Sequence, residues 1–343
     1  MLRAVSALLL WAALVGLSIL GVCGALGAER VARKRRPWAS HGRLAPWTYP
    51  VRRPVGWALG VVANSRFVCA VTEPVPVPPM RSDITDVIYV NYVVPAASLG
   101  PYVPEGLELQ RLGDGGKWAM FTFLTYRHGH FGFEILGPLR RLLGSPVQSN
   151  WRIYVRDPRT KIEGIYFVTN AISATVPSLC ARLTAEAMPM HVWKRARLSR
   201  DHAGKVTLAL DPGVGSAPDA EAELTPCAAA PLEGPWRECF DSYRDFVSYC
   251  VPQDRAMSTQ PWVPRVTRQE IQLGIAIEDC EPLTGGVSSR AARAIVGDAK
   301  PLSFRVASVR FRFAEEAYDP LPPTAPAAAR SDANVPARPR AAS

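Results

Sequence analysis

The feature of this sequence that most constrains its fold is a pair of strand patterns in residues 150–169, NWRIYVRDPRTKIEGIYFVT. Both halves are rich in β-branched and aromatic residues, and residues 157–160 between them have the composition of a turn. The pattern predicts an antiparallel hairpin with Tyr154 opposite Glu163. Because side chains alternate along a strand, one face of the hairpin is expected to carry the polar residues Asn150, Arg152, Tyr154 and Glu163, with Phe167. This face either meets solvent or lines a cavity suited to an anionic ligand.

Further strand patterns occur along the chain, at residues 85–95, 117–126, 188–198, 205–211, 266–277 and 302–313. Helices are predicted at fewer places, residues 176–187, 240–251 and 287–295. The 32 prolines favour turns and sheet edges over long helices. Together these features predict an α+β, mainly β fold: an antiparallel, barrel-like sheet with flanking helices.

The N-terminal region predicts a membrane attachment. Residues 4–28 carry no charge and are long enough to cross a bilayer as one helix. The basic stretch ERVARKRRPW follows, so the positive-inside bias puts the body of a single-pass protein in the cytoplasm. A cleaved secretion signal and an organellar transit peptide are the alternatives. The expected order is a transmembrane helix or signal anchor, a basic proline-rich linker (29–82), a folded domain (83–318) and a disordered Ala/Pro tail (319–343).

Charge and cysteine content exclude several classes of function. Residues 1–66 hold ten Lys or Arg and one Glu, so they account for +9 of the net charge of +10. The rest of the chain is nearly neutral and does not predict binding to nucleic acid. Seven scattered cysteines without a C-x-x-C pair predict neither a zinc ribbon nor a disulfide framework. No P-loop, G-x-S-x-G or dinucleotide motif is present, and no cofactor is expected.

One lysine interrupts the apolar face of the strand predicted at 188–198. Strict alternation puts Lys194 on the same face as Met190, Val192 and Leu198. Complete burial lowers the pKa of an amine by as much as about 3–5 units, and a neutral amine can form a Schiff base with a carbonyl compound. The alternatives are a lysine that reaches solvent at the strand end and a bulge that changes the register.

The stretch RHGHFGFE offers a possible metal site. His128 and His130 share one face of a strand if the strand continues through them, and Glu134 follows four residues later. Two imidazoles and a carboxylate suit a transition metal. The alternative is a glycine-rich loop that leaves the strand, and no second histidine motif occurs downstream.

Several stretches together resemble the YqjF-like uncharacterised proteins of the acetoacetate decarboxylase-like superfamily. They are VVPAASLGPYVPEGLELQRLGDGGKWAMFTF, NWRIYVRDPRTKIEGIYFVTNAIS, FDSYRDFVSYC and QPWVPRVTRQEI, and the similar region covers residues 85–314. The resemblance implies a barrel-like domain with a central cavity, but no common activity. The decarboxylase's Pro-Lys-Lys signature is absent, because HVWKR places Lys194 beside Arg195 without the proline.

The hypothesis that follows is a membrane-anchored domain that binds a small carboxylate or keto compound in its cavity. Arg152 would hold the anion, and Asn150, Tyr154 and Glu163 would orient it. If the protein is a decarboxylase-like lyase, Lys194 would be the Schiff-base amine. A non-catalytic binding protein of the same fold and a metal enzyme using His128 and His130 are the alternatives.

Overall fold

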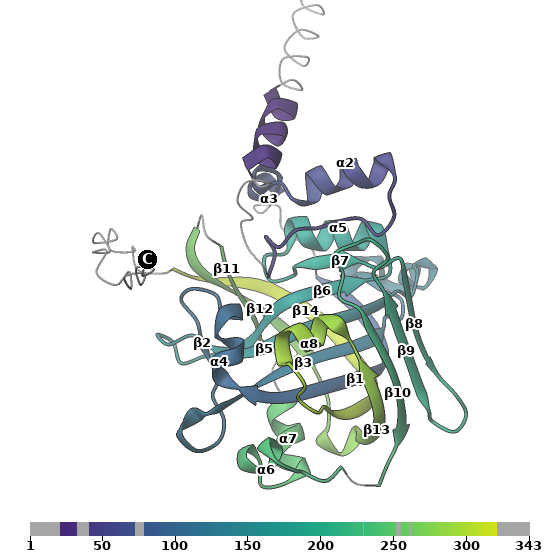
Figure 1. Cartoon of the computed structure of the whole chain (residues 1–343). Helices are drawn as coiled ribbons and strands as arrows, with labels where there is room; N and C mark the ends of the chain where they lie inside the picture. Colours follow the sequence, from purple (N-terminus) through teal and green to yellow (C-terminus); the bar gives the residue numbers. More distant parts are fainter. Residues whose placement is uncertain are drawn as a thin grey trace, which may run out of the picture.

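The computed structural model describes residues 21–32, 41–72, 79–228, 230–251, 255–260 and 263–320. Its strands join into one 14-stranded sheet with helices around it (Figure 1). The α+β, mainly β class is therefore confirmed. The sheet is mixed rather than purely antiparallel, because β7 and β11 each pair in parallel with β6.

The strands are β1 (Met80–Pro95), β2 (Glu108–Leu109), β3 (Trp118–Arg127), β4 (Gly132–Phe133), β5 (Val147–Arg156), β6 (Glu163–Ile172), β7 (Met190–Val192), β8 (Arg195–Arg200), β9 (Val206–Asp211), β10 (Ala220–Pro226), β11 (Arg255–Gln260), β12 (Val263–Leu273), β13 (Cys280–Ser288) and β14 (Leu302–Pro320). The labelled helices are α2 (Pro54–Ala63), α3 (Arg66–Thr72), α4 (Ala96–Leu99), α5 (Thr175–Thr184), α6 (Pro235–Cys239), α7 (Tyr243–Cys250) and α8 (Arg290–Val296). The described residues also contain the 3-10 helices η1 (Gly100–Tyr102), η2 (Asp114–Gly116), η3 (Glu134–Leu142) and η4 (Ile277–Asp279).

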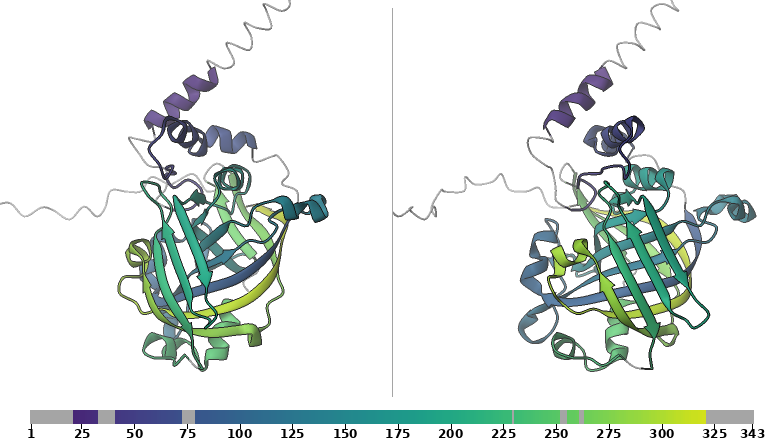
Figure 2. Two further views of the ribbon diagram at one scale, coloured as in Figure 1. Left: turned by 90° about the vertical axis from the view of Figure 1, so that its right-hand side faces the viewer. Right: turned by 45° about the vertical axis from the view of Figure 1, so that its right-hand side comes forward.

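The sheet is strongly curled. Its strand order is β4-β1-β3-β5-β6-β11-β12-β14-β13-β10-β9-β8, and β14 also pairs back with β1. The views in Figure 2 show the strands wrapping around an interior. The sheet as a whole is nevertheless not closed, because β4 and β8 lie at its two ends. The barrel-like expectation is thus right about the curvature and wrong about closure.

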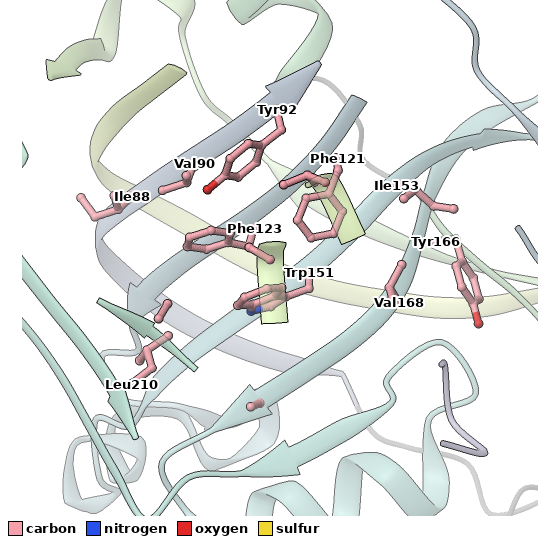
Figure 3. Close-up of a cluster of buried hydrophobic side chains, with 14 of the residues drawn as sticks. Ile88, Val90, Tyr92, Phe121, Phe123, Trp151, Ile153, Tyr166, Val168 and Leu210 are labelled. Atoms are coloured by element: carbon pink, nitrogen blue, oxygen red, sulfur yellow. The ribbon is translucent and has the colours of Figure 1, made fainter. Parts of the chain in front are cut away.

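The central strands are buried on both faces, which explains their nearly continuous apolar sequences. On the outer face, side chains of β1, β3, β5 and β6 pack towards β9, as Figure 3 shows around Trp151. Trp151 is fully buried and stacks on Phe123 with ring centroids 4.6 Å apart. The inner face forms a second apolar cluster, which includes Tyr89, Phe246 and Phe304.

Helix α7 covers one end of the curled sheet, next to α6 (Figure 1). The side chain of Ser242 caps its N-terminus by accepting a hydrogen bond from the Asp245 backbone N–H. The helical spacing seen in the sequence is confirmed, because Phe246, Val247 and Cys250 are all buried. Consequently the last carbonyl groups of α7 lie next to the interior of the sheet.

The N-terminal part differs from a plain linker. Residues 21–32 are helical, and residues 41–72 contain α2 and α3, which pack near α5. The buried Arg182 of α5 joins them by donating hydrogen bonds to the carbonyl oxygens of Ala45 and Ala63. The domain's first strand also begins slightly before the predicted residue 83, at Met80.

The expected transmembrane helix at 4–28 lies largely outside the described residues, and so does the tail from residue 321 onward. Within the described residues, no single helix has both the length and the apolarity needed to cross a bilayer. The pair α2 and α3 meets these criteria only when taken together, with a bend of 63° between the two helices.

Two local predictions needed correction. The hairpin of β5 and β6 exists, but its loop covers residues 157–162, so Tyr154 pairs with Ile165 and not with Glu163. Lys161, at a φ of 60°, lengthens the turn by two residues. In addition, the strand patterns missed β10, which lies within residues 211–235 and pairs with β9 and β13.

Candidate functional site

A partly open cavity of about 30 Å³ lies inside the curled sheet. Most of its wall is aliphatic or aromatic, and its polar lining comes from β1, β3 and β5. The lining residues are Ile84, Val87, Tyr89, Leu124, Tyr126, Asn150, Arg152, Ile165, Phe167, Ile271, Ile275 and Val309. A mainly apolar wall with a few converging polar groups is typical of small-molecule sites.

The charged group in this wall is Arg152, which is only 3% exposed. Its Nη2 donates hydrogen bonds to the carbonyl oxygen of Cys250, at 2.9 Å, and to the hydroxyl of Tyr154, at 3.3 Å. The guanidinium also lies over the rings of Tyr89 and Tyr154, at 5.6 and 5.3 Å from their centroids. The partial negative charge at the end of α7 and the two ring faces therefore stabilise the buried cation.

These contacts leave much of the guanidinium without a partner. Among the described residues, Arg152 Nε makes no hydrogen bond, and no carboxylate forms an ion pair with this side chain. A buried cation is normally paired with an acid. Arg152 therefore brings to the cavity wall a positive charge that no described carboxylate neutralises.

A chain of hydrogen bonds holds Arg152 in place. Tyr154, which accepts from Arg152, lies 2.9 Å from the hydroxyl of Thr122, and Thr122 donates to the side-chain oxygen of Asn91. Since Thr122 donates to Asn91, the Tyr154 hydroxyl must donate to Thr122. Burial raises the pKa of Tyr154, so its phenol stays neutral and keeps this proton. Tyr154 thus positions the guanidinium from behind the cavity wall.

A second polar network reaches the cavity from β3 and β5. The amide of Asn150 donates to the hydroxyl oxygen of Tyr126 at 3.2 Å, and its carbonyl oxygen accepts from Gln148 and Asn170. Burial raises the pKa of Tyr126, so this phenol also remains protonated. No acceptor for the Tyr126 proton is found among the described residues. Tyr126 is therefore a second donor on the wall that Arg152 lines.

Sequence reasoning brought some of these residues together and missed others. The prediction that Asn150, Arg152 and Tyr154 share one face agrees with the structure, in which all three are buried. It missed Tyr126, Tyr89 and the Cys250 carbonyl group. The available signal was the pair of polar residues Asn91 and Thr122 within apolar runs, because strands buried on both faces carry polar side chains only where partners exist.

Glu163 does not join this group. It is exposed at the start of β6, opposite Arg156, and lines a separate groove with Glu108, Arg111 and Tyr249. The physical reason is the longer hairpin loop, which moves Glu163 two residues from its predicted position opposite Tyr154. Glu163 is therefore not available to a ligand held by Arg152 in the cavity.

The expectation that Lys194 lies on a buried face is wrong. The strand predicted at 188–198 is two strands, β7 and β8, and the break falls at Trp193 and Lys194. Alternation does not continue across the break, so the Lys194 side chain is 46% exposed and lies 3.9 Å from the Asp211 carboxylate. Lys194 is not among the residues that line the cavity.

The two histidines do not form a metal site with Glu134. β3 ends at Arg127, and His130 adopts a φ of 52°, so the two rings leave the strand separately. His128 is buried with both ring nitrogens in hydrogen bonds, to Ser82 at 2.8 Å and Gln148 at 2.9 Å. His130 contacts Asp83 near the surface. Over the part of the chain that the structure describes, no group of three metal-ligating side chains is found.

The curled, mainly β sheet around this cavity is similar in its overall arrangement to the folds of known enzymes. An acetoacetate decarboxylase-like enzyme from Sphingomonas wittichii RW1 matches 71% of this chain and 94% of its own, with 12% identity and a TM-score of 0.50. Acetoacetate decarboxylase from Legionella pneumophila matches over 71% and 89%, with 12% identity and a TM-score of 0.48. The enduracididine biosynthesis enzyme MppR, in complex with pyruvate, matches over 71% and 91%, with 14% identity and a TM-score of 0.46.

The family model DUF2071, described as "Uncharacterized conserved protein (COG2071)", matches residues 81–273, from β1 to β12. The chain therefore belongs to this family, and the fold expected from the resemblance to acetoacetate decarboxylase-like proteins agrees with the structural similarity. A comparison with curated proteins gave no match.

The buried His128 predicts a pH dependence of stability. Burial lowers its pKa to about 4 from the usual 6.5, so the unfolded chain takes up a proton at a higher pH than the folded protein does. The contribution of the neutral His128 to the free energy of unfolding is therefore complete above pH 6.5. It is lost as the pH falls towards 4, and amounts in total to about 3 kcal/mol. The free energy of unfolding, measured in urea at several pH values, should depend less steeply on pH in His128→Gln than in the wild type.

His202→Gln is the matched control, because His202 is exposed. The free energy of unfolding of this control should depend on pH as steeply as that of the wild type. His41 and His191, whose pKa values burial also lowers, are unchanged in both variants and add the same slope throughout. An unaltered slope in His128→Gln would contradict the prediction.

Proposed function

We propose that this protein binds a short aliphatic carboxylate, such as a 2-keto acid, in the cavity of its curled sheet. The observation that carries the proposal is the buried guanidinium of Arg152, whose Nε has no partner among the described residues. A carboxylate accepts two hydrogen bonds from an arginine and supplies the missing negative charge. Tyr126 would donate a third hydrogen bond to the same anion.

The rest of the wall defines the other half of the ligand. Aliphatic side chains from five strands, among them Ile84, Leu124 and Ile271, face the cavity. They favour an alkyl chain over a second charged group, because an apolar wall cannot replace the hydration of a charge. The cavity volume of about 30 Å³ favours a ligand of no more than a few carbon atoms.

Ligand-dependent thermal stabilisation tests this function. Butyrate and 2-oxobutyrate should raise the Tm, whereas butanol and butylamine, which lack the negative charge, should not. At a ligand concentration of about 100 Kd, the expected stabilisation is about 2.7 kcal/mol. Arg152→Met should abolish the shift and still fold, because replacing a buried charge by an apolar side chain of similar size is often neutral.

Arg156→Met is the matched control. Arg156 lies on the same strand, four residues further along, but it is half-exposed and pairs with Glu108. Losing a surface ion pair changes stability by about 1 kcal/mol or less, and the butyrate shift should persist. An equal shift in wild type and Arg152→Met would refute the assignment of the cavity as the carboxylate site.

Lyase chemistry through a Schiff base is not part of the proposal. None of the described lysines is buried, and none lines the cavity; they are Lys117, Lys161, Lys194, Lys205 and Lys300. We therefore expect no adduct when the protein is treated with 2-oxobutyrate and borohydride and examined by mass spectrometry. An adduct on Lys194 that is lost in Lys194→Ala would show that this lysine reaches the ligand after all.

Membrane attachment through residues 4–28 is a further part of the proposal. It is supported by the length of this uncharged segment and by the basic residues that follow it. A spanning helix predicts that the full-length protein stays in the membrane fraction after washing with alkaline carbonate, with its C-terminal side protected in sealed right-side-out vesicles. Release into the wash, or a mature chain that begins after residue 28, would favour a cleaved signal.

A further inference from the structure

Exposed large apolar side chains are concentrated in two regions. The first is the N-terminal part, with Val22, Val31, Val55, Trp57, Val62, Phe67 and Val71. The second is a segment around η3, residues 133–143, with Phe133, Ile135, Leu139, Leu142 and Leu143. Scattered exposed apolar residues need no explanation, but groups of this kind mark contact surfaces.

The η3 segment presents its apolar side chains outward. Ile135 is 89% and Leu142 is 84% exposed, although both belong to a helical segment attached to the sheet by the two-residue strand β4. Gly137, at a φ of 49°, and Pro138 divide η3 into two short turns. In both views of Figure 2, these turns stand away from the sheet. Ile135 and Leu142 therefore do not contribute to the core.

The segment is also basic. Arg141 is exposed, and Arg140 lies beside it, held by a hydrogen bond from Nη1 to the backbone oxygen of His130. The acidic residue of η3, Glu134, is neutralised by ion pairs with Arg81 and Arg312. Apolar side chains next to arginines are the composition of a segment that lies in the interface of an anionic bilayer.

The N-terminal region has the same character and lies nearby. Residues 41–72 contain four arginines and no aspartate or glutamate. The segment also carries the exposed Trp57 and Phe67 on α2 and α3. In both views of Figure 2, η3 lies towards the end of the molecule that carries these helices. An anionic bilayer, which has a negatively charged surface and an apolar interior, could contact both regions at the same time.

We propose that the η3 segment is a membrane-docking element, which inserts Ile135, Leu139 and Leu142 into the interface of an anionic bilayer while Arg140 and Arg141 contact the phosphate groups. The contact is separate from residues 4–28 and orients the sheet relative to the membrane surface. It is independent of the ligand in the cavity, since no residue of 133–143 lines that cavity.

Hydrogen exchange of the full-length protein tests this docking. The protein is reconstituted with vesicles of phosphatidylcholine alone or of phosphatidylcholine with phosphatidylserine, and exchange is followed in peptides that cover residues 133–143. Exchange there should be slower with phosphatidylserine. Each arginine near an anionic surface changes the affinity for the membrane about fivefold. The slowing of exchange that phosphatidylserine causes in residues 133–143 should therefore be roughly fivefold smaller in Arg141→Gln.

The double variant Ile135→Ser, Leu142→Ser should lose the protection from exchange that the vesicles with phosphatidylserine give to residues 133–143. The conservative double variant Ile135→Val, Leu142→Val should keep it. Arg244→Gln on α7, near the opposite end of the molecule in Figure 1, is the charge-matched control and should behave as the wild type. Equal exchange in both vesicle types would overturn the proposal. Protection that instead rises with protein concentration without vesicles would also overturn it, because a second copy would then cover the segment.

Discussion

The structure depends on the pairing of β1 with two partners. β1 pairs with β3 along one edge and with β14 along the other, from Met80 to Asn91. This double pairing forces the sheet to curl, so the inner face of every central strand is withdrawn from water. The outer face is covered by the strands β8, β9 and β10, and both faces must therefore satisfy their polar groups within the protein.

The cavity follows from this constraint. Polar side chains on the inner face, such as Tyr154, Thr122 and Asn91, form a chain of hydrogen bonds that begins with the donor Arg152. The guanidinium is stabilised by a helix end and two aromatic rings, not by a carboxylate. This arrangement tolerates the cation in the unliganded protein and leaves its charge available. An apolar wall around it lowers the local dielectric constant and strengthens attraction for an anion.

The fold alone does not assign the chemistry. The overall similarity to an acetoacetate decarboxylase-like enzyme concerns the arrangement of strands and helices, and the same fold supports different activities through different side chains. In this chain the cavity carries an arginine, two phenols and an amide, and its described lysines lie elsewhere. These groups are suited to binding and orienting a carboxylate. The exposed apolar and basic segment around η3 is a separate surface, on which the interior of the sheet places no constraint.

The sequence by itself determined the mainly β class, most strands, the amphipathic helix α7 and the common face of Asn150, Arg152 and Tyr154. These features depend on periodicity and composition, which act over a few residues. It did not determine the register of the β5–β6 hairpin or the direction of Lys194, because a two-residue change in a loop and a two-residue break in a strand leave the composition unchanged.

Tertiary structure alone decided that the sheet curls without closing and that the Cys250 carbonyl and Tyr126 meet Arg152. Those contacts join residues from strands and helices far apart in the chain. Their formation depends on the pairing of β1 with β14, across more than 200 positions of sequence, which no local pattern records.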